Sequence, residues 1–198
     1  KKVRSETSLG SRVDSIGSLV AKLSKKLFED LIDRSALVIG TGEISQILIS
    51  NLKNEGVSEI FIASRDIKNA ITFADKNNCK PIPIEEINDY LKTTDIVFSS
   101  TGSPDFIIKK DDIQIAQEDR KDSIIFLVDI AVPRDIDPRV GDIDCCYLYN
   151  LDDLKSIIDN DFSENNKNLE EASVIIQSSL DSYTHWENSD NVKDIITK

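Results

Sequence analysis

The chain contains 198 residues, which is enough for one domain with a full hydrophobic core and an extension. Hydrophobic residues make up 39% of the sequence and charged residues 30%, and no apolar run approaches the roughly 18 residues that a membrane-spanning helix needs. Because the net charge is −12, the surface as a whole repels the phosphate backbone of a nucleic acid, so the composition argues against broad nucleic-acid binding.

The cysteines predict neither a metal site nor a disulfide framework. Cys79, Cys145 and Cys146 are odd in number and lack metal-ligand spacing, which is typical of reduced thiols in a cytoplasmic protein. No secretory signal opens the sequence, and the lack of any methionine indicates a piece of a longer protein. His185 is the only histidine, and no cysteine has a basic partner by motif, so no catalytic nucleophile is predicted.

The first part of the sequence predicts a helix and then a strand, a turn, a helix and a second strand. Residues 1–12 have no core pattern, and apolar residues at helical spacing predict an amphipathic helix over about 14–30. A short apolar run predicts a strand over 35–39, which leads through a glycine turn into a helix over 43–55. A second apolar run predicts a strand over 59–63.

The rest of the sequence continues to alternate. The remaining predicted elements are a helix over 67–77, a strand over 80–84, a helix over 87–91 and strands over 95–99, 124–129 and 146–149. The prolines of the strand over 80–84 suit only an edge strand or a short one. This alternation predicts an α/β fold with a doubly wound parallel sheet. We assign residues 1–30 to a linker and N-terminal helix, 31–160 to the sheet domain, and 161–198 to a long connecting helix with a narrow apolar stripe.

The glycine turn after the first strand has the features of a phosphate-binding loop. Gly40 and Gly42 let the backbone turn tightly and approach a pyrophosphate, which would lie at the N-terminus of the following helix. Ser45 stands where the usual pattern has a third glycine, so the fingerprint is incomplete and a purely structural turn is the alternative.

The end of the second predicted strand distinguishes between the two nicotinamide cofactors. NAD-binding folds usually place an acidic residue there, which holds the ribose 2′-OH. Here Ser64 and Arg65 take this place, and a hydroxyl and a guanidinium suit a 2′-phosphate. The sequence therefore predicts NADP(H) rather than NAD(H), with a solvated surface arginine as the alternative. We expect Asp66 to cap the next helix.

Two further loops follow predicted strands, at the edge of a parallel sheet where ligands bind. The loop 99–104 is small and rich in hydroxyl groups, which permits close approach to the ribose and nicotinamide part of a dinucleotide, and an ordinary Gly-Ser-Pro turn is the alternative. The loop 129–138 is rich in Asp, Pro and Arg, and we expect it to fix the nicotinamide face or to contact another domain. A local pair between Asp129 and Arg134 is an equal alternative.

The sequence as a whole resembles the glutamyl-tRNA reductase family. The stretches that carry the resemblance are VRSET (3–7), LVIGTGE (37–43), SRD (64–66), TGSP (101–104), DIAVPRDIDP (129–138) and LDDL (151–154). They extend over nearly the whole chain, and the last two are specific. This family usually has Asn-Arg-Thr where the chain has Ser64, Arg65 and Asp66, so the arginine is kept and the last hydroxyl is lost.

The resemblance implies an enzyme of three parts. An N-terminal domain carries a cysteine nucleophile and binds glutamyl-tRNA, a middle domain binds NADPH, and a long helix leads to a C-terminal dimerisation domain. The chain resembles the middle domain with flanking pieces, and it contains neither the family's catalytic cysteine motif nor the dimerisation domain. The implied reaction reduces glutamyl-tRNA to glutamate-1-semialdehyde for tetrapyrrole biosynthesis. The implied partners are the tRNA, a second copy in a homodimer and glutamate-1-semialdehyde aminotransferase.

The motifs and the resemblance together give a set of residues expected to bind NADPH. These residues are Gly40, Thr41, Gly42, Glu43, Ile44, Ser45, Ser64, Arg65, Asp66, Thr101, Gly102, Ser103, Ile130 and Ala131. No metal ligand and no catalytic residue is assigned in the chain. Two alternatives stay open: the NADP-binding domain of a shikimate-dehydrogenase-like oxidoreductase, which has a similar phosphate site, and a non-catalytic nucleotide-binding module.

Overall fold

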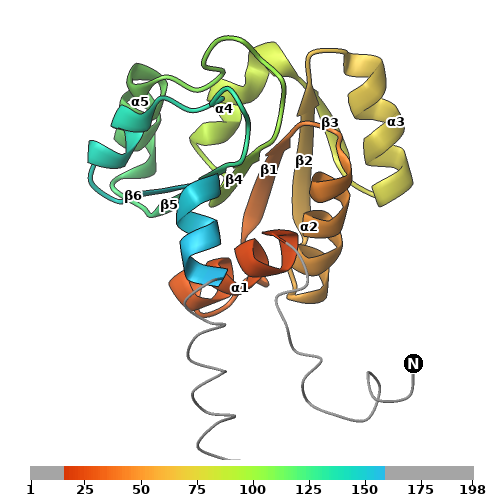
Figure 1. The fold of residues 1–198 in the computed structure, drawn as a ribbon, viewed down its shortest axis with the longest axis horizontal. Coiled ribbons are helices and arrows are strands. Elements are labelled where there is room, and N and C mark those ends of the chain that lie inside the picture. Colours follow the sequence, from red (N-terminus) through yellow and green to blue (C-terminus); the bar gives the residue numbers. More distant parts are fainter. Residues whose placement is uncertain (1–15, 159–198) are drawn as a thin grey trace, which may run out of the picture. The chain divides into compact units, whose positions relative to one another are not determined.

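A six-stranded parallel sheet forms the centre of the computed structural model, which describes residues 16–158 (Figure 1). The strands are β1 (Ser35–Ile39), β2 (Glu59–Ser64), β3 (Lys80–Pro83), β4 (Ile96–Ser99), β5 (Ile125–Asp129) and β6 (Cys146–Asn150). They lie in the order β3-β2-β1-β4-β5-β6, and every neighbouring pair is parallel. This is the strand order of a doubly wound dinucleotide-binding sheet, so the predicted fold class is confirmed. The proline-containing β3 lies at one edge, as predicted.

Helices connect the strands and pack against them and against one another. They are α1 (Ile16–Phe28), α2 (Glu43–Asn54), α3 (Ile67–Asn77), α4 (Ile87–Leu91) and α5 (Lys110–Arg120), with short 3₁₀ helices η2 (Ile84–Glu86) and η3 (Pro138–Asp142). Helix α1 packs against α2, α3 packs against β2 and β3, and α4 packs against α5. The described residues up to Leu154 belong to one compact unit, and those from Lys155 on belong to a second.

Some sequence predictions lie outside the described residues. They concern the linker over 1–12, the long connecting helix over 161–198 and the environment of His185. Among residues 16–158, no helix is both long enough and apolar enough to span a membrane.

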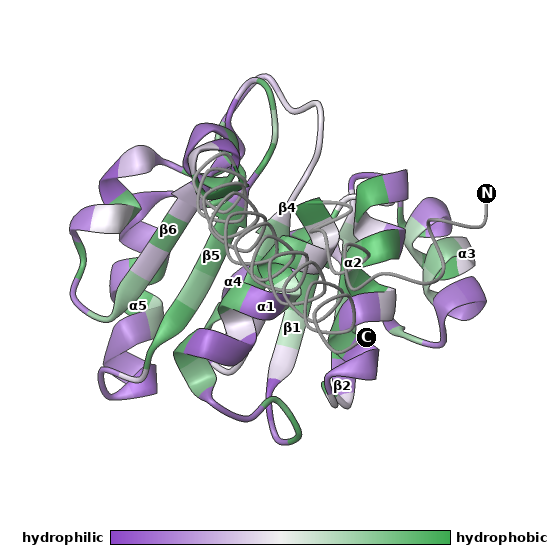
Figure 2. Cartoon of the chain, turned by 60° about the horizontal axis from the view of Figure 1, so that its bottom comes forward, coloured by the Kyte–Doolittle hydropathy of each residue, from purple (hydrophilic) through white to green (hydrophobic). Residues whose placement is uncertain are grey.

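The apolar runs of the central strands form the core because helices or loops cover both faces of the sheet. Every residue of β4 and β5 is buried. In Figure 2 the hydrophobic colour is concentrated on the strands, most continuously on β5, while hydrophilic residues gather on helices and loops. On one face, Leu37, Val97 and Leu127 belong to a buried cluster with Leu91 of α4 and Ile113 of α5. Side chains that alternate along a strand therefore reach separate layers of the core.

Helix α5 is missing from the elements that the sequence predicts. Its buried face consists of Ile113, Ala116, Gln117 and Arg120, which are spaced as one face of a helix. Two of these four residues are polar, so the segment lacks the apolar stripe from which a helix can be recognised. Arg120 and the amide nitrogen of Gln117 find hydrogen-bond partners elsewhere in the fold, whereas Gln117 Oε1 has none among the described residues.

The side chain of Arg120 makes several hydrogen bonds to backbone carbonyl groups outside α5. Its side chain is at the C-terminal end of α5, and the residue is 7% exposed. Nη1 donates to the carbonyl oxygens of Leu91 at 3.1 Å and Thr94 at 2.6 Å, and Nη2 donates to that of Ile124 at 2.7 Å. Burial lowers the pKa of the Arg120 guanidinium, but arginine stays charged at any physiological pH. One side chain thus links the ends of α4 and α5 to the segments that enter β4 and β5.

We expect Arg120→Met to lower the free energy of unfolding by about 2–4 kcal/mol, because it removes several charge-assisted hydrogen bonds and leaves buried carbonyl groups unpaired. Urea unfolding followed by circular dichroism measures the change. Lys22→Met, on an exposed position of α1, changes the charge by the same amount and serves as the control. An unchanged unfolding midpoint for Arg120→Met would show that the guanidinium is not a structural link.

Candidate functional site

The segments that the sequence assigns to the cofactor leave the sheet at one edge. In the parallel register, Ile39 of β1 pairs with Ala63 and with Ser99, and Ser99 pairs with Asp129. The carboxyl ends of β1, β2, β4 and β5 are therefore aligned. The strand order reverses between β1 and β4, and in open α/β sheets the ligand crevice lies outside the carboxyl ends at this point.

Gly40 occupies a position that only glycine fits. Its φ is +112°, and a Cβ at this residue would lie 2.6 Å from the carbonyl oxygen of Ser100. Its N–H donates to the carbonyl oxygen of Ala63 at 2.9 Å. The Oγ atoms of Ser45 and Ser100 are 3.1 Å apart, within hydrogen-bond distance. The glycine turn is thus held directly against the loop that follows β4.

The N-terminus of α2 is open on the side of the glycine turn. Gly42 is the N-cap residue, and it provides no side chain that could cap the helix. A Cβ at Gly42 would have no other atom within 4 Å, so the space beside it is free. Backbone N–H groups at an uncapped helix start can bind an anion, and the helix dipole favours a negative charge there. Glu43 is exposed in this first turn, while Thr41 and Ile44 are half-buried.

At the end of β2 an arginine side chain is exposed to solvent, while the carboxylate of the next residue caps helix α3. Ser64 is the last residue of β2 and is half-buried. Arg65 is exposed, and none of the ion pairs among the described residues includes it. Asp66 is the N-cap of α3, where its side chain accepts a hydrogen bond of 2.9 Å from the N–H of Lys68. The predicted capping role of Asp66 is confirmed.

The loop after β4 is fixed by a residue that sequence reasoning missed. Asp135 is fully buried, and its Oδ2 accepts from Ser99 Oγ at 2.6 Å and from the N–H of Thr101 at 2.9 Å. Its Oδ1 accepts from Thr101 Oγ1 at 2.7 Å. Thr101 Oγ1 also accepts from the N–H of Ser103 at 3.1 Å. Gly102, between these two residues, is exposed, and a Cβ there would meet nothing within 4 Å.

The other two aspartates of the loop 129–138 also brace backbone groups. Asp129 accepts from the N–H of Ala131 at 3.0 Å and of Ile136 at 2.9 Å, and burial raises the pKa of this carboxyl group. None of the ion pairs within 16–158 joins Asp129 to Arg134. Three aspartates at close spacing in a proline-containing loop are a signal for such bracing, since short carboxylates pair with local N–H groups.

Asp137, Ile130 and Ala131 are also held by hydrogen bonds. Asp137 accepts from the N–H of Arg139 at 2.9 Å and from its guanidinium, which lowers the pKa of Asp137 to about 2. The N–H of Ile130 donates to the carbonyl oxygen of Ser99 at 3.0 Å. Ala131 is 7% exposed, and its backbone N–H is held by Asp129. The residues assigned near the nicotinamide thus come from two loops that are bonded to each other.

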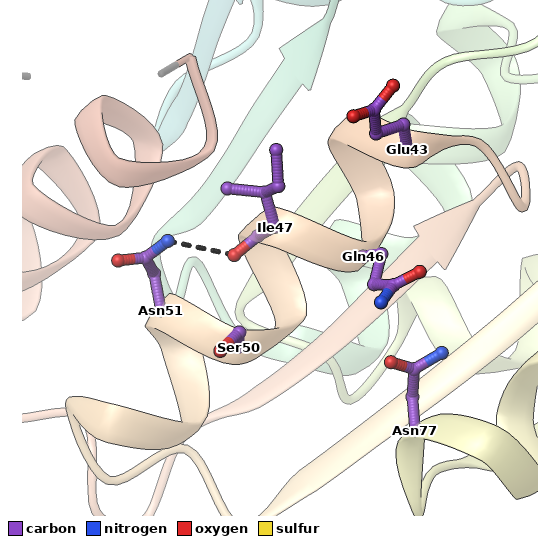
Figure 3. Close-up of a pocket in the computed structure, with 6 residues that line it drawn as sticks. All are labelled: Glu43, Gln46, Ile47, Ser50, Asn51 and Asn77. Carbon is purple, nitrogen blue, oxygen red and sulfur yellow. Dashed lines mark hydrogen bonds between the residues drawn. The ribbon is translucent and has the colours of Figure 1, made fainter. Parts of the chain in front are cut away.

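A separate hollow of about 480 Å³ lies along α2 (Figure 3). Its lining residues are Glu43, Gln46, Ile47, Ser50 and Asn51 of α2, with Asn77 of α3. The hollow shares only Glu43 with the residues assigned to the cofactor, and no residue of the loops after β4 and β5 lines it. The described residues contain no group of three His, Cys, Asp or Glu side chains that could hold a metal ion.

Comparisons with known proteins agree with this description. The profile of the Shikimate / quinate 5-dehydrogenase family matches residues 22–157. The chain is 39% identical over 186 residues to the glutamyl-tRNA reductase of Syntrophobacter fumaroxidans, which is 94% of this chain and 40% of that relative. The chain thus spans about two fifths of the length of such relatives.

Solved structures show the same pattern. Glutamyl-tRNA reductase from Methanopyrus kandleri matches with a TM-score of 0.76 and 29% identity, over 86% of this chain and 43% of that chain. The nucleotide binding domain of glutamyl-tRNA reductase from Thermoplasma volcanium matches with a TM-score of 0.57 and 20% identity, over 79% of this chain and 96% of that chain. The latter similarity supports the fold alone. Because the family profile covers more than half of the chain, this chain belongs to the Shikimate / quinate 5-dehydrogenase family, and its resemblance to glutamyl-tRNA reductases is confirmed.

Proposed function

We propose that this chain is the NADPH-binding part of a glutamyl-tRNA reductase, an oxidoreductase that converts glutamyl-tRNA to glutamate-1-semialdehyde in tetrapyrrole biosynthesis. The assignment of NADPH rather than NADH rests on the arrangement at the end of β2. Arg65 is exposed and belongs to none of the ion pairs within residues 16–158, and the carboxylate of the neighbouring Asp66 is occupied by the N-terminus of α3. A 2′-phosphate therefore meets an available guanidinium there.

The other segments at the carboxyl edge fit the remaining parts of a dinucleotide. The open N-terminus of α2 beside Gly42 suits the pyrophosphate, since its N–H groups are not capped by a side chain. The loops after β4 and β5 lie beyond the switch point, where the ribose and nicotinamide half would extend. When bound, NADPH would supply the hydride for the reduction. The task of this chain is to hold the cofactor so that its reactive ring faces the substrate.

The names of the relatives support the substrate, and the remaining parts of the proposal go further. We assign residues 1–30 to a linker and helix, 31–160 to the cofactor domain and 161–198 to a connecting helix. In this proposal, glutamyl-tRNA binds to a catalytic domain outside the chain, and a dimerisation domain outside it pairs two copies. Glutamate-1-semialdehyde aminotransferase is the proposed partner that takes over the product, and the cytoplasm is the proposed location.

The family profile makes a shikimate-type dehydrogenase domain the second candidate. Identity to glutamyl-tRNA reductases over 94% of the chain favours the first candidate. Joining the chain to the catalytic domain of a related glutamyl-tRNA reductase and, in a second fusion, to the substrate domain of a related shikimate dehydrogenase, and testing each fusion with its own substrate, separates the two. Activity on neither substrate, with NADPH binding retained, would favour a non-catalytic nucleotide-binding module.

We expect Arg65→Ala to weaken NADPH binding about ten- to a hundredfold, because a charged hydrogen-bond partner of the 2′-phosphate contributes roughly 1.5–3 kcal/mol. NADH has no 2′-phosphate, so its affinity should change little. Calorimetric titration of both cofactors measures the two effects. Lys26→Ala, on an exposed position of α1, provides the same change in net charge away from the site. Equal weakening of NADPH and NADH, or of neither, would rule out Arg65 as the group that reads the phosphate.

We expect the chain alone to leave glutamyl-tRNA unreduced in the presence of NADPH. Burial raises the pKa of the thiols of Cys79 and Cys146, which disfavours the thiolate that would attack the glutamyl ester. Semialdehyde formation is measured in the same sample in which NADPH binding is demonstrated, so that an inactive sample is known to be folded. Cofactor-dependent semialdehyde formation would mean that a nucleophile lies within this chain.

The same chain should bind uncharged tRNA weakly. Its net charge of −12 opposes the counterion release that drives nucleic-acid binding. Fluorescence titration of labelled tRNA at low and at moderate salt measures the affinity. Tight binding with a steep salt dependence would reveal a local basic surface and contradict this expectation.

A further inference from the structure

The carboxylate of Asp135 is the acceptor in all three of its hydrogen bonds. A carboxylate has no proton to donate, so each of its three partners must act as a donor. These partners are the hydroxyl groups of Ser99 and Thr101 and the backbone N–H of Thr101. Two of the three donors belong to Thr101, and the Asp135 side chain is completely shielded from solvent. The position of Thr101 is therefore set by Asp135 through both its backbone and its side chain.

A further hydrogen bond connects Thr101 to Ser103. Since the Thr101 hydroxyl donates its proton to Asp135, its oxygen is free to accept from the N–H of Ser103. Ser103 Oγ in turn donates to the carbonyl oxygen of Asp105 at 2.8 Å. The hydroxyl protons of Thr101 and Ser103 are thus used within the protein. What the turn offers to a ligand is its backbone, at the exposed and unobstructed Gly102.

The backbone of Asp135 holds the other end of the same loop. Its carbonyl oxygen accepts from the N–H groups of Ile107 at 2.6 Å and Ile108 at 3.1 Å. The N–H of Asp137 donates to the carbonyl oxygen of Ile108 at 3.0 Å. The loop between β4 and α5 is consequently fixed at both ends by one short stretch of the loop after β5.

We propose that Asp135 is a positioning residue, which shapes the turn Thr101–Ser103 into a backbone platform for the nicotinamide-ribose half of NADPH. This inference rests on the proposed function. The adenosine half would depend instead on the glycine turn and Arg65, which lie on the other side of the switch point between β1 and β4. A change at Asp135 should therefore affect one half of the cofactor and spare the other.

The test compares NADPH with adenosine 2′,5′-bisphosphate, which contains the 2′-phosphate but lacks the nicotinamide half. In Asp135→Asn, one oxygen is replaced by an NH₂ group that faces hydrogen-bond donors. We expect the affinity for NADPH to fall about tenfold or more, and the affinity for the bisphosphate to stay within about twofold. Arg65→Ala should weaken the binding of both compounds, because both contain the 2′-phosphate.

Asp137→Asn is the matched control. Asp137 is also buried and lies in the same loop, but its carboxylate bonds to Arg139 and to the backbone of Lys110, and no hydrogen bond among residues 16–158 joins it to Ser99 or Thr101. It should lower the melting temperature without changing the ratio of the two affinities. If Asp135→Asn fails to fold, Thr101→Val removes the hydroxyl that links Asp135 to Ser103 and should give the same selective loss. Thr101→Ser, which keeps that hydroxyl, should restore NADPH binding.

Each result decides between distinct conclusions. A wild-type chain that binds neither compound would refute the proposed function itself. Wild-type binding of both compounds, with an equal loss for both in Asp135→Asn or in Thr101→Val, would overturn the positioning role and leave the proposed function intact. Unchanged NADPH affinity in either folded variant would overturn it as well.

Discussion

The geometry of the loops after β4 and β5, at the carboxyl edge of the sheet, depends on the carboxylate of Asp135. Loops at the edge of a sheet are surface segments, and they keep one conformation only where their backbone groups find fixed partners. Here the partner is a charged group in a fully buried place, and hydrogen bonds to such a group are stronger than those between neutral groups. Leaving its donors unpaired would be costly, so the loops after β4 and β5 are held together as one unit.

This arrangement also explains how an acidic stretch can belong to a site for a phosphate-rich ligand. Asp129, Asp135 and Asp137 are buried, and each accepts hydrogen bonds from groups of the protein. They lie at the end of β5 and in the loop that follows it, whereas the glycine turn and Arg65 follow β1 and β2 on the other side of the strand reversal. The negative charges are thus separated along the sheet edge from the place where phosphates would bind. The positive end of α2 and the guanidinium remain on the phosphate side.

A feature could be predicted from the sequence where it depends on residues that are close together in the chain. The strands other than β3 were recognisable because each contains a short apolar run, and the predicted bounds agree closely with the structure. The capping role of Asp66 was predictable because its partner, Lys68, is two residues away. The role of Asp135 was not, because its partner Thr101 lies 34 residues away and only the sheet brings them together. Helix α5 was missed for a similar reason, since the buried guanidinium of Arg120 donates to the carbonyl groups of Leu91 and Thr94, which lie 29 and 26 residues away.

The resemblance to a family marked the stretch 129–138 as specific without giving the reason for it. The structure supplies that reason in terms of contacts that continue across the site. Asp135 fixes Ser99 and Thr101, and the residue between them, Ser100, lies against Gly40 of the glycine turn and Ser45 of α2. A side chain at position 40 would collide with the Ser100 carbonyl, which cannot retreat while its two neighbours are bonded to Asp135. Position 40 therefore requires glycine partly because Asp135, in a distant loop, fixes the segment that lies against it. Contacts within the protein thus connect the two halves of the proposed cofactor site.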